Sequence, residues 1–347
     1  MKQIIVPTGY MGSGSSAVTD LLKEYPNLNT RSSDFEYIFL HAPNGVFDLE
    51  NKLLNNNNAV RSDEAIKEFR KLMYRLNEYQ GWWPAGYKYT VSENFISIVD
   101  QYVDSIVQYK FRGSWYIYEK PTKIEWIKNA LFNRLLSLIG MSKKQKFVKN
   151  TQLEFSLMSA EEFYKKTTVF IEKIVNEISP KEDRVVLDQL LLPYNLKRIK
   201  NYNSVDFKPI LITRDPRDVF IANKYVWYPK GENVPYPLDV VEFCRYYKAL
   251  RQYEDNTEEL KFLKIRFEDL VLNYHDTVGI LEDFLNLSPE EHKDKKMYFD
   301  PSRSINNLKI FQRNTEWEEE ISIIEKELKE YLYSFPEKIK FTSDKIF

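Results

Sequence analysis

Four short runs of nearly continuous apolar residues stand out along the chain, and they predict buried strands. They lie at residues 3–6, 184–188, 209–213 and 262–265. A strand that is covered on both faces has no polar face, as in a parallel sheet whose crossover connections are helices. We therefore expect an α/β fold with a central, mostly parallel sheet.

Helical periodicity fills most of the chain between these runs. Apolar residues recur with a spacing near 3.6 over residues 63–79, 95–110, 122–139, 158–178, 237–255, 275–285 and 318–333. The first two strands are about 180 residues apart, far more than a crossover needs. The sequence thus predicts one domain over residues 1–347, with helices that flank the sheet and a large helical insertion at about residues 40–180.

The first strand runs through a glycine-rich turn into a helical pattern. The turn reads Gly9-Tyr10-Met11-Gly12-Ser13-Gly14-Ser15-Ser16. Glycines permit tight turns, and the N–H groups that begin a helix point at an anion held there. A nucleoside triphosphate loop would have lysine where Ser15 stands, because that side chain reaches the β- and γ-phosphates. This P-loop-type turn therefore suits a smaller or differently charged group than ATP presents.

A second strand-to-helix turn follows residues 209–213. It reads Arg214-Asp215-Pro216-Arg217-Asp218, in which aspartate and proline suit the cap and first turn of a helix. Arg214 stands at the carboxyl end of its strand, where open α/β sheets bind ligands, and a guanidinium can bind phosphate through paired hydrogen bonds. A structural salt bridge to Asp218 or another carboxylate is the alternative for Arg214. Two such turns predict a ligand with two separate anionic groups.

The two turns resemble those of the P-loop sulfotransferases, which use 3′-phosphoadenosine 5′-phosphosulfate (PAPS). The resemblance implies that residues 10–16 hold the 5′-phosphosulfate and residues 214–219 the 3′-phosphate. Residues 262–287 and 313–320 are similar to two later family segments, the second of which closes over the nucleotide. The resemblance covers nearly the whole chain and implies adenosine 3′,5′-bisphosphate as a product.

Several positions depart from the family pattern. The loop lysine of many members falls at Gly12, and the serine that shares the 3′-phosphate falls at Ala222, next to Asn223, which is its nearest substitute. The C-terminal Arg-Lys-Gly signature is absent, which leaves Arg313 or Lys309 as candidate nucleotide contacts. These departures leave open a catalytically degenerate PAPS-fold binding protein.

The resemblance also implies a general base that removes the acceptor proton, either histidine or glutamate. Glu36 is the better candidate, because it falls in an alternating stretch, predicted as a strand, where related enzymes place their glutamate. Asp34 would face the same side of that strand. Lys149, in a segment that resembles a Lys-Thr-Pro segment of some members, is the candidate for the cation missing at Gly12.

The composition of the chain limits the kinds of binding partner and the cellular compartment that we expect. The net charge of −1 gives no field that would draw the chain to nucleic acid. One cysteine, Cys244, rules out an internal disulfide framework, and no apolar stretch has the length of a signal or a transmembrane segment. We therefore expect a cytoplasmic protein, and the sequence leaves its oligomeric state open.

The resemblance implies an acceptor that carries a hydroxyl group, and the helical insertion at about residues 40–180 is expected to shape the acceptor side. The resemblance implies a saccharide, or otherwise a lipid or a sterol, and the aromatic clusters at residues 81–89 and 115–118 could line its pocket. A P-loop nucleotide kinase is the rival enzyme on the same sheet. It would need lysine at position 15 and a strand-end carboxylate for magnesium, for which Asp188 is the candidate.

Overall fold

The computed structural model describes residues 2–31, 33–78, 81–116, 122–140, 151–252, 254 and 262–343. Its centre is a four-stranded sheet in the order β4-β1-β5-β6, in which every neighbouring pair is parallel. The strands are β1 (Gln3–Gly9), β4 (Arg184–Val186), β5 (Asp206–Thr213) and β6 (Leu263–Arg266). The four predicted strands and the α/β class are confirmed.

The register places the two glycine- and arginine-containing turns side by side. β1 pairs with β5 along its whole length, from Gln3 opposite Asp206 to Gly9 opposite Ile212. Both strands therefore end at the same edge of the sheet, where β4 lies on the other side of β1. Turns that follow β1 and β5 meet at this edge, as expected for the ligand edge of an open parallel sheet.

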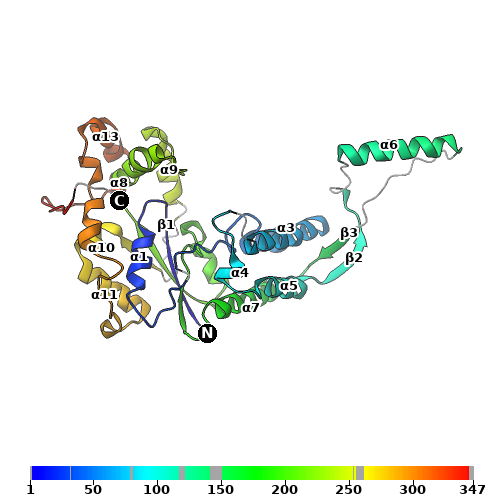
Figure 1. The fold of residues 1–347 in the computed structure, drawn as a ribbon, viewed down its shortest axis with the longest axis horizontal. Coiled ribbons are helices and arrows are strands. Elements are labelled where there is room, and N and C mark those ends of the chain that lie inside the picture. Colours follow the sequence, from blue (N-terminus) through cyan, green and yellow to red (C-terminus); the bar gives the residue numbers. More distant parts are fainter. Residues whose placement is uncertain are drawn as a thin grey trace.

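Successive residues of β1 enter different cores. Ile4 and Val6 pack with the insertion, whereas Ile5 packs with the helices of the opposite face. Figure 1 shows these two groups on either side of the strands. The helices of the insertion are α2 (Val46–Glu50), α3 (Ala59–Asn77), α4 (Tyr87–Thr90), α5 (Phe95–Ile106) and α7 (Ala160–Ile178), and those of the opposite face are α1 (Ser15–Leu22), α10 (Phe267–Leu272) and α11 (Tyr274–Leu285).

A third core lies beyond the ends of β1 and β5. It joins Tyr10 of the first turn to the helix after β5 and to the C-terminal helix. Its helices are α8 (Pro216–Ile221), α9 (Val240–Gln252) and α13 (Glu318–Glu327), and the short α12 (Pro301–Ser304) lies before α13 in the chain. The C-terminal part of the chain is thereby packed against the ligand edge of the sheet.

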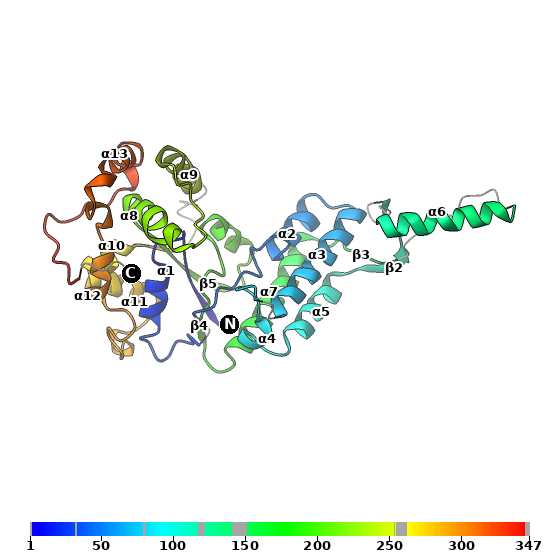
Figure 2. The same cartoon turned by 45° about the horizontal axis from the view of Figure 1, so that its top comes forward.

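The insertion also carries an arm that the sequence did not predict in full. β2 (Tyr109–Gly113) and β3 (Thr151–Phe155) form an antiparallel hairpin, and α6 (Lys123–Leu138) lies beyond it. Both views place α6 far from the sheet and from the other helices (Figures 1 and 2). None of the helices in the described part of the chain is long and apolar enough to cross a membrane.

The strand predicted around Glu36 is wrong. Residues 33–39 form turns and irregular backbone. The N–H of Tyr37 donates to the carbonyl of Asp188 and the N–H of Ile38 donates to the Tyr87 hydroxyl, so these bonds go to scattered partners and build no ladder. Asp34 and Glu36 therefore do not share a strand face: Asp34 binds Lys23 at the surface, and Glu36 is half-buried.

Candidate functional site

A cleft of about 1020 Å³ opens at the carboxyl ends of β1, β4 and β5. Both predicted turns line it, through residues 9–12 and 14–17 and through Arg214. Glu36 and Asp188 line it from the side of β4, and residues 298–300, 303, 304 and 307 from the C-terminal part. The cleft thus collects residues from four distant parts of the chain.

The first turn presents the start of a helix to this cleft. α1 begins at Ser15, its cap residue is Gly14, and no described side chain caps it. Its first turn contains no acidic residue. The N–H groups at the start of α1 and the positive end of its dipole therefore suit an anion.

Two glycines of the turn hold conformations that a side chain would disturb. Gly12 has φ +81°, and a Cβ there would lie 3.0 Å from the Trp227 ring. Gly14 has φ +95°, and a Cβ there would lie 2.6 Å from Phe267. Left-handed backbone and close neighbours both favour glycine. A lysine at position 12 would therefore need a strained left-handed backbone and a small shift of the Trp227 indole.

Arg214 joins the two turns. It is 3% exposed, and its Nη1 donates to the carbonyl of Gly12 at 3.2 Å. Its Nη2 donates to the carbonyl of Asn307 in the C-terminal part, and its guanidinium lies 5.0 Å from the centre of the Phe267 ring. Arg214 therefore brings a positive charge to the cleft and fixes two of its walls.

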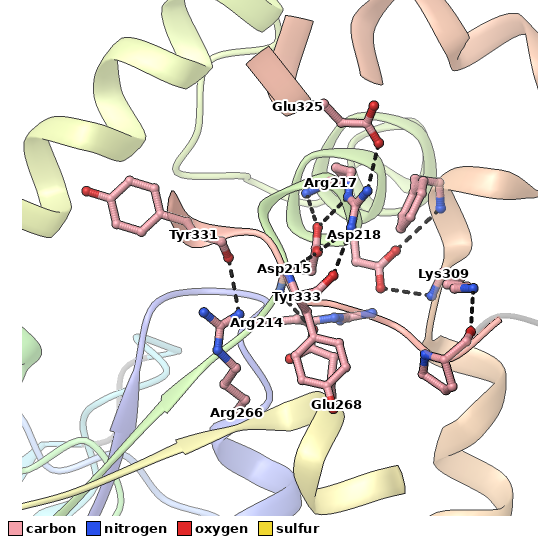
Figure 3. Close-up of polar contacts among 12 residues, drawn as sticks. Arg214, Asp215, Arg217, Asp218, Arg266, Glu268, Lys309, Glu325, Tyr331 and Tyr333 are labelled. Atoms are coloured by element: carbon pink, nitrogen blue, oxygen red, sulfur yellow. Dashed lines mark hydrogen bonds and ion pairs between the residues drawn. The ribbon is translucent and has the colours of Figure 1, made fainter. Parts of the chain in front are cut away.

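The rest of the second turn anchors the C-terminal part (Figure 3). Asp215 accepts hydrogen bonds from the Arg217 guanidinium and from the N–H of Tyr333, and Arg217 also pairs with Glu325 at 2.7 Å. Asp218 is fully buried and accepts from the N–H of Lys309 at 3.0 Å. These residues are structural, and Arg214 is the charged member of the turn that lines the cleft.

A buried carboxylate holds the C-terminal wall from the other side. Glu24, just after α1, accepts hydrogen bonds from the N–H groups of Tyr298 and Phe299 and lies 2.6 Å from His292 Nε2. The wall held in this way presents Arg303 to the cleft, loosely paired with Asp300 at 3.8 Å. Arg303 is a cation that the sequence analysis missed, because nothing in its neighbourhood marks it as a ligand.

Glu36 and Asp188 form a carboxyl pair in the cleft. Burial raises the pKa of Glu36. Asp188 is 8% exposed, no described group donates to its Oδ1, and burial together with the nearby Glu36 raises its pKa to about 8. Two such carboxyls do not both ionise readily at neutral pH. Asp188 is therefore the member of the pair that holds a proton at pH 7.

Gln189 links the carboxyl pair to the first turn. Its Nε2 donates to Ser15 Oγ at 3.2 Å, and Thr8 Oγ1 donates to its Oε1 at 3.3 Å. Its backbone is left-handed, with φ 54°, and its carbonyl lies 2.9 Å from His41 Nε2. Burial lowers the pKa of His41 to about 4, so the ring is neutral at pH 7 and donates this bond. His41 positions Gln189 and does not line the cleft.

The other predicted site residues lie apart from the cleft surface. Ser13 is buried, with its hydroxyl against Gly9 and its N–H bonded to the Tyr10 carbonyl. Ala222 and Asn223 are buried, and the Asn223 amide donates to the carbonyl of Val219 in α8. Arg313 donates to the Asn306 carbonyl and does not line the cleft either. Lys149 lies outside the described residues.

The two aromatic clusters separate in the structure. Trp83 lines the cleft, together with Tyr194, Tyr236 and Trp227, and these rings offer flat apolar surface beside the carboxyl pair. Residues 115 and 116 follow the hairpin of the arm, and residues 117 and 118 lie outside the described part. The cleft therefore combines an uncapped helix start, two arginines, a carboxyl pair and aromatic walls.

Comparison with known proteins gives fold similarity only. Neither a protein-family model nor a curated protein sequence matches the chain. The sulfotransferase domain from the curacin biosynthetic pathway is 15% identical, with 97% of this chain and 99% of that chain covered and a TM-score of 0.38. Sulfotransferase STF9 from Mycobacterium avium is 13% identical, with 98% of this chain and 78% of that chain covered and a TM-score of 0.38. The sulfotransferase domain from the Synechococcus PCC 7002 olefin synthase is also 13% identical, with 96% of this chain and 95% of that chain covered and a TM-score of 0.38. The identities and TM-scores are low, so the function is argued from the cleft itself.

Proposed function

We propose that this chain is a sulfotransferase, which moves a sulfuryl group from PAPS to a hydroxyl-bearing acceptor. One observation carries the proposal: both strand-to-helix turns line a single cleft, and Arg214 bonds across from one to the other. A donor with two anionic ends needs two such positive sites close together. The cleft volume of about 1020 Å³ leaves room for a nucleotide and an acceptor.

The residues present suit the donor. The start of α1 would hold the phosphosulfate end, with the hydroxyls of Ser15 and Ser16 beside it. Arg214, together with Arg303, would hold the 3′-phosphate. When bound, PAPS supplies an activated sulfuryl group whose leaving group is adenosine 3′,5′-bisphosphate.

The carboxyl pair would handle the proton. As the acceptor oxygen forms its bond to sulfur, the bond from sulfur to the phosphate oxygen breaks, and Glu36 takes the acceptor proton. Asp188 stays protonated near neutral pH, which keeps the negative charge beside an anionic donor low. The aromatic walls favour an acceptor with a flat apolar face, such as the underside of a sugar ring or a sterol.

Turnover with a defined donor tests the proposal. The purified chain is incubated with PAPS and with saccharides, lipids or sterols, and adenosine 3′,5′-bisphosphate is measured as the product. A parallel incubation with ATP and magnesium tests a kinase. Acceptor-dependent product from PAPS supports the proposal; ATP-dependent phosphorylation, or PAPS binding without turnover on any acceptor, would replace it with a kinase or with a degenerate binding protein.

A further inference from the structure

Helix α6 carries a continuous apolar face that points into solvent. None of its residues is buried. Ile124, Ile127, Leu131, Leu135 and Leu138 follow one another at intervals of three or four residues, so they lie along one side of the helix, and each is between 50% and 77% exposed. A patch of this kind marks an interaction surface in a folded protein.

The arm holds this face clear of the rest of the molecule. The hairpin of β2 and β3 leads away from the insertion, and α6 lies at its far end in both views (Figures 1 and 2). Exposed aromatic residues accompany it: Trp126 on the helix, and Phe111 and Tyr116 near the end of the hairpin. The apolar face can therefore meet a broad surface without a clash from the body of the protein.

The charge around the apolar face is positive. α6 contains Lys123, Lys128 and Arg134 against a single acidic residue, Glu125, which is engaged in the helix cap with Thr122. Lys128 and Arg134 each stand three residues from Leu131, so they border the apolar side of the helix. The whole chain has a net charge of −1, so this excess is local to the arm.

We propose that α6 docks the protein on the surface of an anionic lipid bilayer, with its apolar side in the acyl region and its lysines and arginine at the headgroups. A helix whose apolar side is bordered by basic residues binds bilayers in this way. α6 has 16 residues, or about 24 Å at 1.5 Å per residue, which is shorter than the roughly 30 Å core of a bilayer. It therefore lies in the plane of the interface.

The charges favour lipid over a second copy of this chain. Pairing of two α6 helices through their apolar faces would bring Lys128 and Arg134 of one copy close to the same residues of the other. Like charges at such a seam are destabilising, whereas anionic headgroups neutralise them. The proposal is independent of the proposed sulfuryl transfer, because it concerns binding by the arm alone.

Vesicle flotation with the full chain tests the docking. We expect the protein to float with vesicles of phosphatidylcholine containing about 30% phosphatidylglycerol, and to float much less with phosphatidylcholine alone or in about 1 M NaCl. Absence of flotation with the anionic vesicles would overturn the proposal. A dimer in sedimentation velocity that depends on α6, without vesicle binding, would overturn it in favour of a second copy.

Variants assign the binding to α6. Leu131→Glu with Leu135→Glu should lower vesicle binding by about tenfold or more, because the two exposed leucines that would enter the acyl region become charged. Ile280→Glu with Met297→Glu, at positions 54% and 64% exposed on the body of the protein, is the matched control and should bind as the parent does. Lys128→Gln with Arg134→Gln should weaken binding to the anionic vesicles only. Parent-like binding of the Leu131 and Leu135 variant would refute the assignment.

Discussion

Gln189 Nε2 donates to Ser15 Oγ at 3.2 Å, so the residue after Asp188 contacts the first helical residue after the glycine-rich turn. The contact ties the carboxyl pair to the anion-binding turn. The contact exists because β4 lies next to β1 in the sheet, although β1 ends at Gly9 and β4 begins only at Arg184. The proposed proton acceptor and the proposed anion site are thereby fixed relative to one another.

Replacement of Glu36 by glutamine should lower the rate of sulfuryl transfer about a hundredfold, because the amide cannot accept the acceptor proton. Affinity for adenosine 3′,5′-bisphosphate should change little. Asp34→Asn is the control, since the Asp34 carboxylate is 86% exposed and pairs with Lys23. Initial rates with PAPS and calorimetric titration of the nucleotide separate the two effects; an unchanged rate would remove Glu36 from the mechanism.

Replacement of Arg214 by alanine should weaken nucleotide binding by about 1.5–3 kcal/mol, the value of a charged hydrogen bond. Arg313→Ala is a close control, because Arg313 also donates to a carbonyl of the C-terminal part, at Asn306, but does not line the cleft. Calorimetric titration with adenosine 3′,5′-bisphosphate measures both variants. Equal losses would show that Arg214 acts only by holding the wall in place.

Replacement of Asp188 by asparagine should stabilise the fold at neutral pH. The pKa of Asp188 is about 8 in the folded protein, above its value near 4 in an unfolded chain, so the folded state holds a proton that the unfolded state releases between these values. The Asp188 carboxyl therefore makes its full contribution to the free energy of unfolding below pH 4, and this contribution is lost as the pH rises to about 8. Asparagine removes that loss.

The gain from Asp188→Asn should be about 1 kcal/mol or more at pH 7.5 and should vanish near pH 4. Urea denaturation at both pH values measures it. Asp34→Asn, whose parent carboxylate is 86% exposed, is the surface control. A destabilised Asp188→Asn protein at pH 7.5 would mean that the native carboxyl is ionised and held by charges in the cleft.

Replacement of Gly14 by alanine should destabilise the fold by about 1–3 kcal/mol, because the new Cβ meets Phe267 in a left-handed backbone. Gly231→Ala separates the two causes: Gly231 has φ +82°, but nothing lies within 4 Å of its Cβ position. Thermal unfolding should therefore show a larger loss for Gly14→Ala. Equal losses would mean that Phe267 moves aside freely.

Local sequence predicts the strands well and the cleft only in part. Continuous apolar runs mark β1, β4, β5 and β6, because a strand covered on both faces needs apolar side chains on both faces. Alternation around Glu36 indicated a strand, but the residues there bond to Asp188 and Tyr87, which no local pattern can reveal. The sequence did not identify Gln189 and Arg303 as site residues for the same reason. Only the order of the strands and the packing of the C-terminal part bring them to the cleft.

The wall formed around residues 298–307 has a consequence for biosynthesis. The last strand of the sheet is complete at Arg266, yet Arg214 and Glu24 hold parts of the chain made after it. A ribosome-bound chain that ends soon after β6 would possess its sheet and both turns but would lack the wall of the cleft that residues 298–307 form. Ligand affinity should accordingly arise late in translation, when the final segment closes over the earlier ones.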